Sequence, residues 1–130
     1  MRTAFCDSSA LVKLVVAEPE SSALSGSLRA YSRVTASALS VVEVLRAVGR
    51  HDPSLQVRAH RLFQSLHLVA LDANVLKRAA LLHPLDLRAL DAIQLASALS
   101  VLELEPDFVA YDKRILRAAT LAGLRTLSPL

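Results

Sequence analysis

The sequence has a single cysteine, Cys6, among its 130 residues. An intrachain disulfide is therefore excluded, and with it the class of small domains that depend on a disulfide framework. Because Cys6 lies in an apolar run, we expect it to be buried as a small hydrophobic side chain. Nothing in that run would activate it as a thiolate nucleophile.

Several common catalytic and phosphate-binding patterns are missing too. The three glycines are isolated, so the chain has no glycine-rich phosphate loop. The four histidines do not follow zinc-ligand spacing. A phosphotransfer domain built on Asp7 is disfavoured, because that motif needs a second acid two residues later and Ser9 stands there.

The chain also lacks an apolar run long enough to span a bilayer. Asp7 and Lys13 interrupt the apolar stretch near the start, and no cleavage-like site follows it, so a secretory signal is not predicted. We therefore expect a cytoplasmic protein without a membrane partner.

Aromatic residues make up 4% of the chain and hydrophobic residues 53%. The core must then consist of Leu, Val and Ala, which suggests helices packed on a small buried sheet. The length suits one domain, 1–130. Twelve of the fifteen cationic residues are arginines and the formal net charge is +3, which favours an anionic partner such as phosphate. For most of these arginines, however, a solvated surface position is the better interpretation.

Short apolar runs alternate with helical patterns along the whole chain. This alternation predicts an α/β fold with a central parallel sheet of about five short strands, joined by right-handed crossovers and flanked by helices. The expected strands are 2–6, 33–36, 66–71, 108–111 and 124–127. The expected helices are 10–16, 21–29, 38–50, one that begins at Pro53, 73–82, one from 86 or 88 to about 102, and 113–122. Ligands of such sheets bind beyond the carboxyl ends of the strands.

Two acids follow predicted strands. Asp7 comes after the first strand and Asp112 after the fourth, so both are expected at the same edge of the sheet. Each has a simpler interpretation as the N-cap of the next helix. For Asp7 that interpretation is weaker, because Ser8 or Ser9 can cap the helix instead.

Two further acids, Glu43 and Asp91, lie inside apolar helix segments, where an unpaired carboxylate is costly. The simpler interpretation is an ion pair on the helix surface, with Arg46 three residues after Glu43 and Arg88 three residues before Asp91.

The four acids together are stronger evidence for a metal site than any one of them alone. Two carboxylates ~4 Å apart repel by about 4 kcal/mol at an effective dielectric constant of 20, so a cluster needs protons or a cation. Carboxylate-rich sites suit Mg²⁺ or Mn²⁺. Such a metal can activate water and neutralise charge on a phosphate, which is the chemistry of phosphodiester hydrolysis.

Four segments resemble, in order and spacing, the acidic motifs of PIN-domain proteins. They are 7–14 (DSSALVKL), 40–46 (SVVEVLR), 90–98 (LDAIQLASA) and 108–116 (FVAYDKRIL). The resemblance covers nearly the whole chain, and the short single-domain form is similar to the VapC toxins of bacterial type II toxin–antitoxin modules. One departure is Gln94, where the third motif often has His.

The resemblance implies a Mg²⁺-dependent endoribonuclease that cuts RNA, is inhibited by a VapB-type antitoxin and forms a homodimer. It makes Asp7 and Asp91 the principal metal ligands. Glu43 would complete the metal site or orient the attacking water, and Asp112 would complete the cluster directly or through water. Ser8 or Ser9 would hydrogen-bond a ligand or the Asp7 carboxylate.

Other functions remain open at this stage. The chain could be a PIN nuclease for RNA maturation or branched DNA, although its short length argues against the DNA enzymes. It could also be a catalytically silent PIN-like binding module, although the presence of all four acids argues against that. Arg46, Arg88 and Arg114 are candidates to steer the RNA backbone.

Overall fold

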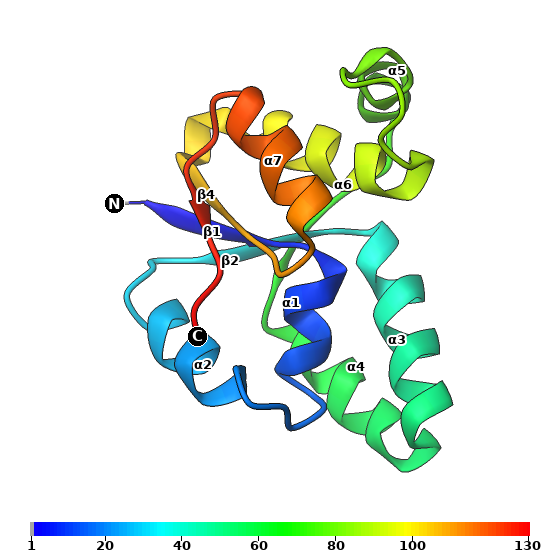
Figure 1. Ribbon diagram of the computed structural model, residues 1–130. Helices are drawn as coiled ribbons and strands as arrows, with labels where there is room; N and C mark the ends of the chain where they lie inside the picture. Colours follow the sequence, from blue (N-terminus) through cyan, green and yellow to red (C-terminus); the bar gives the residue numbers. More distant parts are fainter. Residues whose placement is uncertain (1) are drawn as a thin grey trace.

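The computed structural model describes residues 2–130 as an α/β fold around one sheet (Figure 1). The strands are β1 (Thr3–Cys6), β2 (Val34–Ser37), β3 (His67–Val69), β4 (Pro106–Val109) and β5 (Thr126–Leu127). The helices are α1 (Ser8–Lys13), α2 (Ser21–Leu28), α3 (Leu39–His51), α4 (Gln56–Gln64), α5 (Ala73–Leu81), α6 (Ala89–Leu99) and α7 (Lys113–Leu121), with short 3₁₀ turns at Pro53–Leu55 and Leu102–Leu104. Over this range no helix is both long enough and apolar enough to cross a membrane.

All five strands run parallel, in the order β3-β2-β1-β4-β5. This confirms the predicted parallel sheet of about five short strands. β1 lies in the middle, where Phe5 is paired with Thr35 of β2 on one side and with Phe108 of β4 on the other. Every residue of β1 and β4 is buried, as expected for inner strands of a parallel sheet.

Helices cover both faces of the sheet and enclose two hydrophobic cores. Residues of α1, α2, α3 and α4 pack on one face, around side chains such as Leu11 and Val44. Residues of α6 and α7 pack on the other face, around Phe5 and Phe108, whose rings stack with their centroids 5.6 Å apart. α5 packs against α6 and lies apart from the sheet (Figure 1). Cys6 is buried with a free thiol, as predicted, and burial raises the pKa of that thiol.

The strand boundaries differ from the prediction by one or two residues. β4 begins and ends two residues early, β3 is shorter at both ends, and β5 begins two residues late. β1 begins one residue late, and β2 is shifted by one residue. The segment Glu105-Pro106-Asp107 looks like a turn in the sequence, yet proline is tolerated at the first position of a strand. Gly123 follows the C-cap of α7 and has a positive φ of 92°.

Asp107 takes part in β4 because its charge is fully satisfied there. Its Oδ1 accepts a hydrogen bond from Arg2 Nε at 2.6 Å, and its Oδ2 accepts one from the Tyr31 hydroxyl at 2.8 Å. Arg125 Nε lies 3.5 Å from Oδ2. Arg2, Tyr31 and Arg125 precede β1, β2 and β5, so this buried carboxylate joins the amino ends of four neighbouring strands. Burial and the bond to Asp107 raise the pKa of Tyr31 to about 12.

Candidate active site

The site lies at the carboxyl edge of β1 and β4. From β1 the chain adds β2 and then β3 on one side of the sheet. It then returns to the other side of β1 and adds β4 and β5, so the strand order reverses between β1 and β4. Ligands of open parallel sheets bind at such a reversal. Asp7 directly follows β1, and its N–H donates to Val109 O of β4 at 3.1 Å. Asp7 therefore stands at the point where the topology predicts a ligand.

Asp7 is 5% exposed and caps α1. Its Oδ1 accepts from the Ala10 N–H at 3.1 Å and from Ser9 Oγ at 2.6 Å. The expectation that Ser8 or Ser9 caps this helix is wrong, because Asp7 has the extended backbone of an N-cap and both serines lie in the first helical turn. Ser9 does bond the Asp7 carboxylate, as predicted, and its Oγ also accepts from the Tyr111 N–H at 3.0 Å.

The carboxyl group of Asp7 is harder to ionise than an ordinary aspartate. Burial raises its pKa from 3.8 to about 6, against the opposing hydrogen bonds from Ser9 and Ala10. The negative charges of Asp91 and Asp112 raise the pKa of Asp7 further. Since Asp91 and Asp112 act on Asp7 through space, the structure brings these three acids close to one another.

Asp91 lies in the first turn of α6 and is partly buried. Its pKa is raised by burial and then by the charges of Asp112 and Glu43, while Arg88 and Arg114 oppose the shift. Glu43 therefore belongs to the same cluster.

The simpler interpretation of Glu43 and Asp91, as members of ion pairs, is not borne out. Neither the Glu43–Arg46 pair nor the Asp91–Arg88 pair forms a salt bridge in residues 2–130.

Asp112 has two roles. It caps α7, with its Oδ1 accepting from the Arg114 N–H at 2.8 Å, so the capping interpretation is correct. Its side chain is exposed, and its charge still raises the pKa of Asp7 and Asp91. Capping and membership of the acid cluster are therefore compatible.

A polar network that was not predicted from the sequence lies behind Glu43. Glu43 Oε1 accepts from Ser8 Oγ at 2.7 Å and from Gln94 Nε2 at 2.9 Å, and Ser40 Oγ lies within 2.9 Å of both Ser8 Oγ and Gln94 Nε2. Gln94, the departure from the third acidic motif, is buried. A signal was present, because Ser40 precedes Glu43 by three residues and so shares its helix face.

The donor chemistry of the cluster fits a hard divalent cation. Among residues 2–130, no three His, Cys, Asp or Glu side chains are arranged so that they could hold one ion together. Mg²⁺, however, is usually held by one or two carboxylates and several waters. Burial is the main cause of the raised pKa values of Asp7 and Asp91, and the charges of the neighbouring acids add to it. A divalent cation would relieve that repulsion between the acids.

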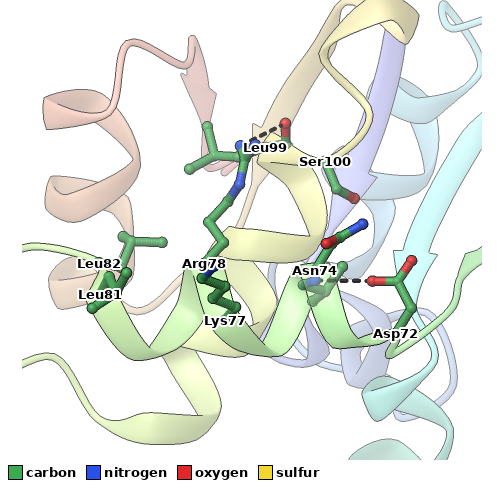
Figure 2. Close-up of a pocket in the computed structure, with 9 residues that line it drawn as sticks. Asp72, Asn74, Lys77, Arg78, Leu81, Leu82, Leu99 and Ser100 are labelled. Atoms are coloured by element: carbon green, nitrogen blue, oxygen red, sulfur yellow. Dashed lines mark hydrogen bonds between the residues drawn. The ribbon is translucent and has the colours of Figure 1, made fainter.

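A hollow of about 760 Å³ lies elsewhere, between α5 and the end of α6 (Figure 2). Two charged groups of this hollow serve the fold. Asp72 caps α5 by accepting from the Val75 N–H at 2.9 Å, and Arg78 Nη1 donates to Leu99 O at 3.1 Å. None of the four clustered acids lines it; the lining residues are Asp72, Asn74, Val75, Lys77, Arg78, Leu81, Leu82, Leu99 and Ser100.

The fold of the chain matches that of solved structures. A toxin–antitoxin complex from Klebsiella pneumoniae superposes with a TM-score of 0.74 at 19% identity, covering 98% of each chain. VapC20 of Mycobacterium tuberculosis, described as a sarcin-ricin loop cleaving toxin, superposes with a TM-score of 0.75 at 17% identity, covering 96% of this chain and 98% of that one. At these identities the likeness concerns the fold.

Sequence relatives cover the chain from end to end. Ribonuclease VapC46 of Mycobacterium tuberculosis is 39% identical over 129 residues, which is 99% of both chains. Ribonuclease VapC47 of the same species is 37% identical over 130 residues and 96% of both chains. The family model described as PIN domain matches residues 4–121. The chain therefore belongs to the PIN-domain family.

Proposed function

We propose that this protein is a Mg²⁺-dependent endoribonuclease and the toxin of a type II toxin–antitoxin module. The observation that carries the proposal is the cluster of Asp7, Glu43, Asp91 and Asp112 at the strand-order reversal, with the pKa of two of these acids raised. The full-length relatives named as VapC ribonucleases support the substrate class.

Asp7 and Asp91 would hold the cation, with Glu43 and Asp112 in support. Bound there, Mg²⁺ (or Mn²⁺ in its place) would supply positive charge to the phosphodiester and make nearby water more acidic. Asp7 suits this role because its position is fixed by Ser9 and by the cap of α1. Glu43 would orient the attacking water and take up its proton.

Arginines beside the acids would receive the RNA backbone. Arg88 and Arg114 are exposed and close enough to Asp91 to act on its pKa, and neither forms a salt bridge in residues 2–130. Their guanidinium groups are therefore available to bind phosphate oxygens on either side of the scissile bond. Arg46, one turn along α3 from Glu43, is likewise exposed.

The partners follow from the same assignment. We propose that a VapB-like antitoxin covers the acid cluster, that the toxin forms a homodimer and that it acts on cytoplasmic RNA. The Klebsiella pneumoniae structure, a toxin–antitoxin complex with this fold, supports the antitoxin partner.

Metal removal should stop cleavage. We expect the purified protein to cut single-stranded and loop-containing RNA in Mg²⁺, to lose this activity in excess EDTA, and to recover it with added Mg²⁺ or Mn²⁺. The measurement is a gel or fluorescence assay with a labelled RNA. Undiminished cleavage in EDTA would show that the acids do not act through a metal.

The same assay separates the alternative functions. A flap or branched DNA cut faster than RNA would indicate the DNA-processing class of PIN nuclease. Absence of Mn²⁺ binding by calorimetry, together with absence of cleavage, would indicate a silent binding module. The presence of all four acids leads us to expect neither result.

Removing Arg88 or Arg114 should weaken RNA binding without changing the chemistry. We expect Arg88→Ala and Arg114→Ala to raise KM, and to reduce the slope of log(kcat/KM) against log[salt] by about 0.7 for each lost single-strand phosphate contact. Arg29→Ala is the matched control, because Arg29 is exposed but lies at the end of α2, away from the acids. Equal slopes for all three variants would argue against the assignment.

A further inference from the structure

Gln94 of α6 is a buried amide in direct contact with one of the clustered acids. It is 2% exposed, and its Nε2 lies 2.9 Å from Glu43 Oε1, 2.9 Å from Ser40 Oγ and 3.0 Å from Ser8 Oγ. The contact joins three helices, since Ser8 belongs to α1, Ser40 and Glu43 to α3, and Gln94 to α6.

The hydrogen bonds of this network converge on a single carboxylate oxygen. Gln94 Nε2 carries two hydrogens and each serine hydroxyl carries one. One amide hydrogen and the Ser8 hydroxyl hydrogen are donated to Glu43 Oε1. The second amide hydrogen is donated to the serine oxygens, and the Ser40 hydroxyl then donates to Ser8 Oγ. Glu43 also fixes the orientation of the amide, because a flipped Gln94 would bring its carbonyl oxygen against the carboxylate.

The hydrogen bonds of the network reach Glu43 Oε1 and leave two other side-chain oxygens, Gln94 Oε1 and Glu43 Oε2, without a donor among residues 2–130. Gln94 Oε1 is buried without a hydrogen-bond partner among residues 2–130, which costs free energy that an apolar side chain of the same size would avoid. Glu43 Oε2 accepts no hydrogen bond within the same range, although Oε1 accepts two. Gln94 is therefore a poor choice for a core position and a good choice for holding one end of Glu43.

We propose that Gln94 is a positioning residue for Glu43: its amide, with the Ser8 hydroxyl, holds Oε1 in place and leaves Oε2 free for the cation or the attacking water. This inference rests on the function proposed above. Groups that hold a metal-site carboxylate typically change metal affinity or activity by 10–100-fold when they are removed.

The test compares Gln94→Met with Gln94→His in the full-length protein. Gln94→Met is close in size and removes both the donor and the unpartnered acceptor. We expect it to fold with undiminished stability, to bind Mn²⁺ about tenfold more weakly by calorimetry, and to lose about tenfold in kcat with little change in KM. Gln94→His keeps a ring N–H donor and should restore most of the Mn²⁺ affinity.

Ser97→Ala is the matched control. Ser97 is a buried polar residue one turn further along α6, where it bonds Ser37 Oγ at 3.0 Å, away from the acids. We expect this variant to bind Mn²⁺ as the unaltered protein does. Ser8→Ala gives a second route if Gln94→Met does not fold, because it removes the other donor to Oε1 and should weaken Mn²⁺ binding in the same way.

The outcomes separate the two proposals. Unchanged Mn²⁺ affinity in Gln94→Met and Ser8→Ala, in a protein whose cleavage needs metal, would overturn the positioning role alone. Lower stability with unchanged metal affinity would identify Gln94 as a core residue only. Absence of metal binding in the unaltered protein would instead overturn the proposed function itself.

Discussion

Asp7→Asn is expected to abolish RNA cleavage and leave the fold intact. Asparagine keeps an oxygen that can accept from the Ala10 N–H and Ser9 Oγ, and it is as good an N-cap as aspartate. The variant lacks only the negative charge that the proposed metal site requires. We expect kcat/KM to fall by more than about 100-fold, the upper end of what is lost when a group that only supports a metal ligand is removed.

Asp72→Asn is the matched control for this variant. Asp72 caps α5 as Asp7 caps α1, but it is exposed and is not one of the clustered acids. The Asp72→Asn variant should cleave RNA at the same rate as the unaltered protein. If Asp7→Asn cut RNA as fast as Asp72→Asn at saturating Mg²⁺, Asp7 would have no part in the chemistry.

The same substitution should stabilise the metal-free protein near neutral pH. The pKa of Asp7 is about 6 in the folded chain and 3.8 ordinarily, so between these values the folded state binds more protons than the unfolded state. Stability from this group is present below pH 4 and is lost as the pH rises through 6. Because asparagine does not ionise, Asp7→Asn keeps this stability at higher pH. For a pKa shift of this size the difference in the free energy of unfolding is up to about 3 kcal/mol.

Urea unfolding in EDTA, at pH 4 and at pH 7.5, measures this effect. The stability difference between Asp7→Asn and the unaltered protein should be small at pH 4 and should favour the variant at pH 7.5. A variant that is less stable at pH 7.5 would mean that the cap and the Ser9 bond depend on the charge.

Asp107→Ala should produce the largest loss of stability. Removing one partner of a buried ion pair typically costs 3–5 kcal/mol, and we expect about 3 kcal/mol because Arg2 and Arg125 are partly exposed and can turn to water. Cleavage per folded molecule should not change, since Asp107 lies at the amino end of β4 and Asp112 follows its carboxyl end. Urea denaturation and the RNA assay measure the two effects separately.

The contacts of Asp107 give a graded series of controls. Tyr31→Phe removes one hydrogen bond to a charged group and should cost about 1.5 kcal/mol. Arg125→Ala removes a longer, largely exposed ion pair and should cost less than about 1 kcal/mol. If Asp107→Ala were no worse than Arg125→Ala, the buried carboxylate would not hold the strands together.

The sequence was sufficient to predict where Asp7 and Asp112 lie, because that prediction needs only the strand ends. Asp7 and Asp112 follow β1 and β4, and the parallel arrangement brings those ends to one edge. The cap of α1 was misassigned because three consecutive residues, Asp7, Ser8 and Ser9, have side chains that can cap a helix. The helix-capping preferences of these three residues are too similar to distinguish them. The extended backbone of Asp7 identifies it as the N-cap.

Side-chain contacts between distant segments were out of reach of sequence patterns. Gln94 and Ser8 are separated by 86 residues, and nothing local indicates that their side chains meet at Glu43. The contacts of Asp107 also come from distant segments of the chain. It follows a proline and looks like a turn residue, and only the approach of Arg2 and Tyr31 from other segments makes it part of a strand.

The pairing of β1 with β4 has a consequence for synthesis of the chain on the ribosome. β4, the partner of β1, comes about one hundred residues later in the chain, with Thr3 opposite Pro106. Contacts so distant in sequence form late in folding, because a long loop must close first. A nascent chain that ends before Pro106 lacks β4, so β1 still has one open edge, and a chain that ends before Asp112 holds at most three of the four acids. The acid cluster is therefore completed only after Asp112 has been translated.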